Sequence, residues 1–173
     1  EELRAAIEGR TARIGVIGLG YVGLPLVHAF GEAGFPVCGF DVDERKISML
    51  RGGQSYIDRV PAEWVERKFA AGALEVTNDF ARLSEMDAVI ICVPTPLTKT
   101  REPDLSYVVQ TAEQVRDHAR PGQIVVLEST TYPGTTEEVL KPLLEESGLE
   151  VGKDIFLAFS PERVDPGNDR FTT

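Results

Sequence analysis

Residues 14–23, with the sequence Ile-Gly-Val-Ile-Gly-Leu-Gly-Tyr-Val-Gly, decide the fold of this chain. The first four residues form a short apolar run that predicts a buried strand, and apolar residues at helical spacing follow the glycines. Between strand and helix stand Gly18, Gly20 and Gly23, in the spacing Gly-x-Gly-x-x-Gly. In such a turn the first glycine permits the bend, the second admits a pyrophosphate close to the backbone, and the third lets the helix pack against the strand. The stretch therefore predicts a phosphate-binding turn at the start of a helix.

The rest of the chain alternates between short apolar runs and helical patterns. We expect strands at 14–17, 37–40, 74–76, 88–93, 124–127 and 155–159, and helices at 21–33, 43–50, 61–71, 79–83, 104–119 and 135–144. The strands are continuously apolar, which is typical of strands that are covered on both faces. Six such strands alternating with helices predict an α/β fold of the Rossmann type, a doubly wound parallel six-stranded sheet with helices on both faces.

The length of 173 residues suits one domain. We expect residues 1–12 to be an N-terminal extension, 13–160 to be the Rossmann domain, and 161–173 to begin a connection to a further region. The net charge of −10 argues against nucleic acid or an anionic membrane as a partner, and no apolar run is long enough to cross a membrane. Two cysteines without metal-ligand spacing favour a reduced, cytoplasmic protein.

The second chemical signal is Asp41, which ends the second expected strand 21 residues after Gly20. An acid at this place accepts hydrogen bonds from the adenosine ribose hydroxyls of a dinucleotide, and it repels the 2′-phosphate of NADP. The sequence therefore predicts NAD as the cofactor. Asp41 could instead cap the following helix, but Asp43 can serve as that cap.

Three further loops follow later strands and should share the same sheet edge. They are Val93-Pro94-Thr95-Pro96, Glu128-Ser129-Thr130-Thr131 and Ser160-Pro161-Glu162-Arg163. Ligands of open α/β sheets bind at the carboxyl ends of the strands, so these loops are candidates for binding or catalysis. The first loop could equally be a plain turn, and Glu162 with Arg163 could be an exposed ion pair.

The remaining reactive side chains favour structural roles. Cys38 and Cys92 lie within expected strands, which indicates buried thiols rather than nucleophiles. His28 and His118 have no acid at a spacing that would make either a good general base.

In this order, the motifs resemble the UDP-glucose/GDP-mannose dehydrogenase family over nearly the whole chain. The resemblance rests on Gly18-Leu19-Gly20-Tyr21-Val22-Gly23-Leu24-Pro25, Phe40-Asp41-Val42-Asp43, Val93-Pro94-Thr95-Pro96, Ser129-Thr130 and Ser160-Pro161-Glu162-Arg163. Within the family the chain is most similar to the UDP-N-acetylglucosamine 6-dehydrogenases. UDP-glucose enzymes commonly have Lys-Ser-Thr where this chain has Glu128-Ser129-Thr130.

The resemblance implies oxidation of a sugar C6 alcohol to a carboxylate with two NAD and one water, through a cysteine-bound intermediate. It implies cofactor contacts by Gly18, Gly20, Tyr21, Val22, Gly23, Asp41, Lys46, Thr95 and Thr130. Thr130 and Glu162 would place the catalytic water, and Glu162, Arg163 and Val164 would contact the sugar nucleotide. The catalytic cysteine, a helper lysine and the uridine-binding domain would lie beyond Thr173, so the chain alone should be inactive. A UDP-sugar and a second copy in a homodimer or larger homo-oligomer are the implied partners, in surface polysaccharide synthesis.

Other interpretations of the sequence remain open. The sugar could be UDP-glucose or UDP-N-acetylmannosamine. The chain could belong to a β-hydroxyacid-type dehydrogenase, which would lack the Ser160-Pro161-Glu162-Arg163 element, or it could be a non-catalytic NAD-sensing domain.

Overall fold

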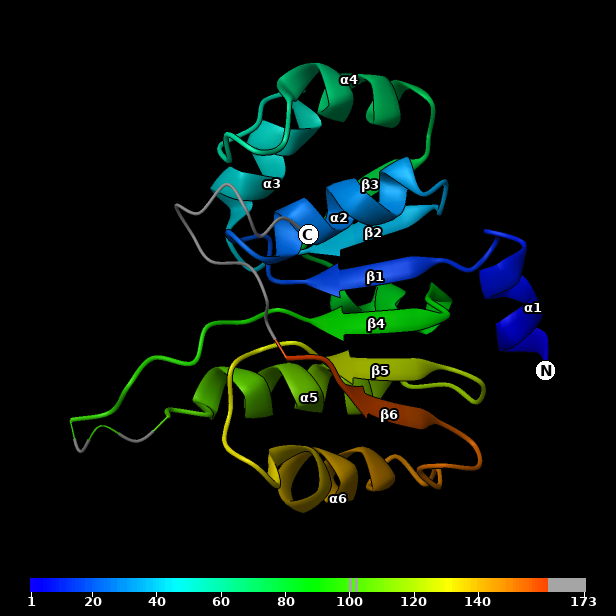
Figure 1. Ribbon diagram of the computed structural model, residues 1–173, viewed down its shortest axis with the longest axis vertical. Helices are drawn as coiled ribbons and strands as arrows, with labels where there is room; N and C mark the ends of the chain where they lie inside the picture. Colours follow the sequence, from blue (N-terminus) through cyan, green and yellow to red (C-terminus); the bar gives the residue numbers. More distant parts are fainter. Residues whose placement is uncertain (100, 102, 162–173) are drawn as a thin grey trace.

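The computed structural model describes residues 1–99, 101 and 103–161, which build one six-stranded sheet with helices on both faces (Figure 1). The strands are β1 (Ile14–Ile17), β2 (Val37–Phe40), β3 (Leu74–Thr77), β4 (Ala88–Ile91), β5 (Ile124–Leu127) and β6 (Phe156–Phe159). All neighbouring strands are parallel, and their order is β3-β2-β1-β4-β5-β6. This order confirms the predicted Rossmann fold. Strands are added outward in one direction from β1 and in the other direction from β4, so the topological switch point lies between β1 and β4, where open α/β sheets bind ligands.

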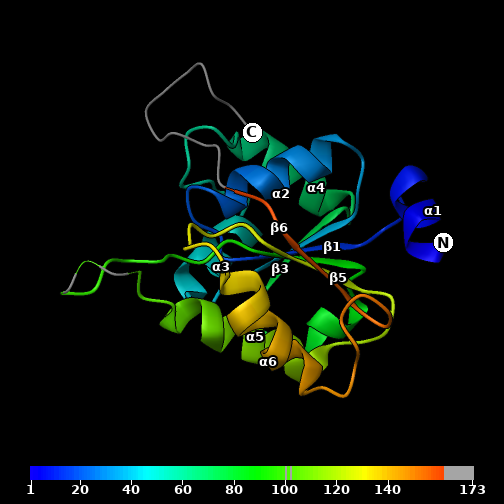
Figure 2. The same ribbon diagram turned by 60° about the horizontal axis from the view of Figure 1, so that its bottom comes forward.

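The helices divide between the two faces of the sheet. They are α1 (Glu2–Glu8), α2 (Gly23–Glu32), α3 (Glu44–Arg51), α4 (Ala62–Ala70), the 3₁₀ helix η1 (Phe80–Glu85), α5 (Ser106–His118), the π-helix η2 (Thr136–Leu140) and α6 (Lys141–Glu145). Helices α2 to α4 accompany β1 to β3, while α5 and α6 lie side by side on the other face (Figures 1 and 2). Right-handed crossovers between parallel strands produce this division.

Each face has its own hydrophobic core. On one face, Leu24 of α2 and Trp64 of α4 pack with Val16 of β1. On the other, Val108 of α5 and Leu144 of α6 pack with alternate strand residues such as Val89, Ile91 and Leu127. Successive residues of a strand therefore point into the two cores in turn, and this explains why the strands are continuously apolar in sequence.

The structure corrects several expected boundaries. Helix α2 begins at Gly23 rather than at residue 21, because the residues before it form the turn. The helix expected at 135–144 is a π-helix followed by α6. Pro142 has no backbone N–H and cannot donate the i→i−4 hydrogen bond of an α-helix. This missing bond accounts for the π-helical turn before it. The expected extension 1–12 contains α1, which the sequence did not predict.

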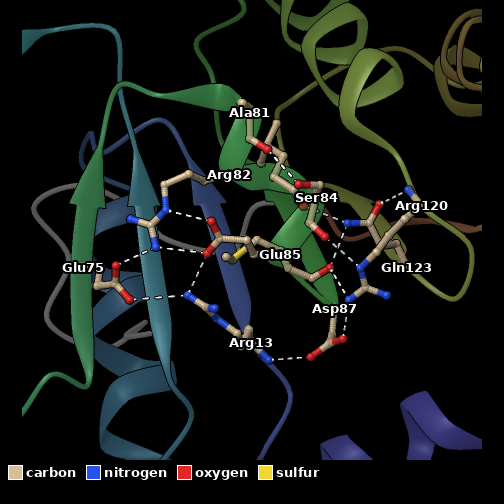
Figure 3. A network of polar contacts seen from close by, with 11 residues as sticks. Arg13, Glu75, Ala81, Arg82, Ser84, Glu85, Asp87, Arg120 and Gln123 are labelled. Atoms are coloured by element: carbon tan, nitrogen blue, oxygen red, sulfur yellow. Dashed lines mark hydrogen bonds and ion pairs between the residues drawn. The ribbon is translucent and has the colours of Figure 1, made fainter.

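A polar network joins the elements at the amino-terminal edge of the sheet, opposite the glycine turn (Figure 3). Arg82 of η1 lies 2.6 Å from Glu75 of β3 and 3.1 Å from Glu85. Arg13 also contacts both of these carboxylates. A second part of the network links Arg120 to Asp87 at 2.6 Å. These contacts fix the end of η1 near Glu85 to β3 and to the residue before β1.

Candidate functional site

A cleft of about 1120 Å³ lies at the carboxyl ends of the central strands. Its walls come from segments that directly follow β1, β2, β4 and β5, together with η1 and α5. Of the expected cofactor residues, all except Gly23 line it: Gly18, Gly20, Tyr21, Val22, Asp41, Lys46, Thr95 and Thr130. A cleft of this kind across the switch point is where a doubly wound fold binds a dinucleotide.

The glycine turn has three glycines for three different reasons. Gly18 has a φ of +92°, and a Cβ there would lie 2.5 Å from the Cys92 carbonyl oxygen. A Cβ at Gly23 would collide with the carbonyl oxygen of Gly18, so this glycine lets α2 approach the strand closely. At Gly20 nothing lies within 4 Å of the Cβ position, which leaves open space beside the backbone. The turn therefore matches the arrangement in which a pyrophosphate occupies the space next to the second glycine.

Three backbone N–H groups of this turn, all after Leu19, face no acceptor in the described structure and can meet an anion. Within the described part of the chain, no acceptor is hydrogen-bonded to the N–H of Gly20, Tyr21 or Val22. These groups precede and open α2, where the helix dipole favours negative charge. Tyr21 is 71% exposed, so its side chain does not close the site. The arrangement fits a bound diphosphate without needing a basic side chain.

Asp41 is 5% exposed and already bears three hydrogen bonds. Its Oδ2 accepts from the Leu19 N–H and from the Lys46 ammonium, both at 2.8 Å, and its Oδ1 accepts from the Asp43 N–H at 2.9 Å. A carboxylate offers about four acceptor positions, so Oδ1 retains one for a ribose hydroxyl. As expected, Asp43 is the N-cap of α3 and accepts from the Arg45 N–H.

The loops after β4 and β5 are joined by Ser129. Its buried hydroxyl donates to the Val93 carbonyl oxygen at 2.7 Å, so it has a structural task. Thr95 is half-buried and Thr130 is exposed, and both line the cleft beside Cys92. The structure therefore brings together the threonines that the resemblance assigns to the nicotinamide side.

The two thiols differ in their surroundings. Cys38 is 2% exposed, which confirms the prediction of a buried thiol, and burial raises the pKa of this thiol to about 12. Cys92 is only partly buried and lines the cleft, because it follows β4 rather than lying inside the strand. Burial also lowers the pKa of His28, whose ring packs edge-on against Trp64 outside the cleft.

Sequence reasoning missed two parts of the site. Tyr107, Gln110, Thr111 and Gln114 of α5 line the cleft, and their spacing i, i+3, i+4, i+7 is that of one helix face. This stripe of hydroxyl and amide side chains, beside the apolar face of α5, was the available signal. Tyr56 was also missed, because its contact with the glycine turn joins residues 37 positions apart.

Glu162, Arg163 and Val164 lie outside the residues that the structure describes, so their expected roles stay predictions. Within residues 1–99, 101 and 103–161, no cluster of His, Cys, Asp or Glu is suited to a metal ion. The same residues contain no helix that is long and apolar enough to span a membrane.

The fold and the cleft define a dinucleotide-binding domain, and comparison with known proteins specifies which one. Residues 12–171 match the description "UDP-glucose/GDP-mannose dehydrogenase family, NAD binding domain". The chain is 43% identical over 156 residues to Protein CapL of Staphylococcus aureus, and 40% identical over 158 residues to UDP-N-acetyl-D-glucosamine 6-dehydrogenase of Pseudomonas aeruginosa. Each alignment covers 90% of this chain and 36% of the relative.

Solved structures agree with the sequence relatives. A ternary complex of GDP-mannose dehydrogenase from Pseudomonas aeruginosa superimposes with a TM-score of 0.83 at 32% identity, over 88% of this chain and 36% of that one. The chain belongs to the UDP-glucose/GDP-mannose dehydrogenase family, as its NAD-binding domain, and the cofactor prediction of NAD is confirmed. It spans about a third of the length of these relatives, so the activity of a whole protein is a matter for proposal.

Proposed function

We propose that this chain is the cofactor-binding part of an enzyme that oxidises the C6 hydroxyl of UDP-N-acetylglucosamine to the carboxylate, using two NAD. The observation that carries the proposal is the cleft, in which a glycine turn with free N–H groups lies beside Asp41. The relative named UDP-N-acetyl-D-glucosamine 6-dehydrogenase, at 40% identity, supports the choice of sugar.

The residues of the cleft have separate tasks in this proposal. The N–H groups of Gly20, Tyr21 and Val22 bind the pyrophosphate, while Asp41 fixes the adenosine ribose. When bound, NAD supplies the hydride acceptor. Thr95 and Thr130 orient its nicotinamide end, and Thr130 with Glu162 positions the water that hydrolyses the covalent intermediate. Arg163 and Val164 are proposed to contact the sugar nucleotide.

UDP-N-acetylmannosamine is the second candidate substrate. Relatives named UDP-N-acetyl-D-mannosamine dehydrogenase include one from Pyrococcus horikoshii that is 37% identical over 156 residues. The difference from the 40% identity of the UDP-N-acetyl-D-glucosamine relative is small, so identity alone does not choose between the two sugars. A protein that binds NAD only as a sensor is the third candidate.

The test is turnover by the longer protein that contains this chain. NADH formation is followed with UDP-N-acetylglucosamine, UDP-N-acetylmannosamine and UDP-glucose at saturating NAD. The proposal expects the highest kcat/KM with UDP-N-acetylglucosamine and two NADH per sugar. A higher value with another sugar would reassign the substrate, and NAD binding without turnover of any sugar would favour a sensor. The same protein is also proposed to form a homodimer or larger homo-oligomer, which sedimentation would show.

A further inference from the structure

The peptide units on both sides of Leu19 are each held by one side chain. The Leu19 N–H donates to Asp41 Oδ2 at 2.8 Å, and the Leu19 carbonyl accepts from the Tyr56 hydroxyl at 2.7 Å. Leu19 itself is fully buried at the centre of the glycine turn. Its side chain packs against the core, so the residue cannot shift without disturbing α2 and β2.

The hydrogen bond from Tyr56 has a direct effect on the next residue. The Leu19 carbonyl and the Gly20 N–H belong to one planar, trans peptide unit, so their directions are opposite and locked together. Fixing the carbonyl therefore fixes the Gly20 N–H, which is one of the free groups of the turn. Without this contact, the freedom of Gly20 in φ would allow the peptide unit to rotate at little cost.

The hydroxyl of Tyr56 is suited to act as a permanent donor. The residue lies between α3 and α4, is half-buried, and packs against the core beneath α2. Burial, and then the neighbouring carboxylates of Asp41 and Asp43, raise the pKa of the phenol above its ordinary value of 10. The phenol therefore keeps its proton across the whole range in which the protein is handled.

We propose that Tyr56 is a positioning residue, which orients the Gly20 N–H toward the cofactor pyrophosphate by holding the Leu19 carbonyl. The inference rests on the proposed cofactor site at the glycine turn. It gives a function to a side chain that contacts the turn from behind and does not line the cleft.

The test is Tyr56→Phe, which removes the hydroxyl and keeps the ring. Affinities for NAD, ADP-ribose and adenosine are measured by calorimetry or NMR titration, well below the melting temperature of each variant. NAD and ADP-ribose contain the pyrophosphate, whereas adenosine contains only the part that Asp41 meets. We expect NAD and ADP-ribose to bind roughly 2- to 13-fold more weakly, the equivalent of one neutral hydrogen bond, and adenosine to bind as before.

The control is Tyr132→Phe, which removes the same hydroxyl from an exposed tyrosine outside the cleft lining and should leave all three affinities unchanged. Equal losses for adenosine and NAD would indicate general damage and overturn the positioning role, as would unchanged NAD affinity in folded Tyr56→Phe. If Tyr56→Phe does not fold, Tyr56→His takes its place and must show the same selective loss. Failure of the wild-type chain to bind NAD would instead reject the cofactor site itself.

Discussion

The ammonium of Lys46 lies 2.8 Å from Oδ2 of Asp41, and this is the same oxygen that accepts the Leu19 N–H. A buried carboxylate is costly unless it is paired, and here Lys46 and two backbone N–H groups pair it. Asp41 therefore holds the glycine turn, and its remaining acceptor position is the one that we propose for the ribose. Lys46 lines the cleft through this contact with Asp41, and its place beside the adenosine stays a prediction.

The wild-type chain should bind NAD more tightly than NADP, because a 2′-phosphate would meet the Asp41 carboxylate. Asp41→Asn should weaken NAD binding by about 1–3 kcal/mol, the usual cost of an unmet hydrogen bond to a charged group.

Lys46→Gln should increase the preference for NAD, since it removes the cation nearest to the place of a 2′-phosphate. Calorimetry with both cofactors measures these effects. Equal or tighter binding of NADP by the wild type would contradict the assignment of Asp41.

Gly20→Val should abolish NAD binding while the chain stays folded. The Cβ position of Gly20 is open and its φ is not positive, so the side chain enters only the space needed by the pyrophosphate. Gly23→Ala is the matched contrast, because its Cβ would collide with the backbone at Gly18 and should lower the melting temperature. Circular dichroism and NAD titration separate the two effects. A folded Gly20→Val variant that retains NAD affinity would remove the turn from the cofactor site.

The 173-residue chain should bind NAD without oxidising any nucleotide sugar. The proposed reaction needs a reactive thiolate facing the nicotinamide. Cys38 is buried with a pKa of about 12, and Cys92, although it lines the cleft, directly follows the apolar strand β4 and packs against the hydrophobic core. NADH absorbance is followed with UDP-N-acetylglucosamine, UDP-glucose and UDP-N-acetylmannosamine. Sustained NADH production that disappears in Cys92→Ser would show that the active site has been misplaced.

Stability at low pH should depend in part on Glu85. The hydrogen bond from Arg82, and then the charges of Arg82 and Arg13, lower the pKa of this carboxyl from its ordinary 4.5 (Figure 3). A lowered pKa in the folded state adds stability above pH 4.5, and this is lost as the pH falls through the folded value. Glu85 is 38% exposed, so Glu85→Gln should cost no more than about 1 kcal/mol at pH 7.

The measurement is urea unfolding of wild type and Glu85→Gln in steps from pH 7 to pH 3. The difference between them should shrink below pH 4.5. Glu66→Gln, on the exposed side of α4, is the control and should differ little from wild type throughout. A difference that stays constant with pH would show that the ion pairs of Glu85 are not its source.

The sequence predicted those parts of the site that depend on short-range patterns. The turn from Gly18 to Gly23 follows from glycine spacing, and Asp41 follows from its place at the end of β2. The contact between Tyr56 and Leu19 could not be predicted, because it depends on how the segment between α3 and α4 packs beneath α2. The doubly wound sheet was predicted from the alternation of strands and helices, whereas the π-helix before Pro142 depends on local geometry that periodicity does not report.

The order of the strands also has a consequence for how the chain folds. Strands β1 to β3 and β4 to β6 are each joined by short crossovers, whereas the central pair brings Ile14 beside Ala88. Closing this long loop costs more entropy than closing a single crossover, so the two halves should form before they join. The glycine turn and Asp41 belong to the first half, and Thr95 and Thr130 to the second.

In a refolding experiment, NAD binding should therefore arise with the slowest phase, after most helical ellipticity has returned. Recovery of NAD binding and helical ellipticity at one rate would contradict this order. The cofactor would then report the assembly of the two halves, in addition to serving the chemistry.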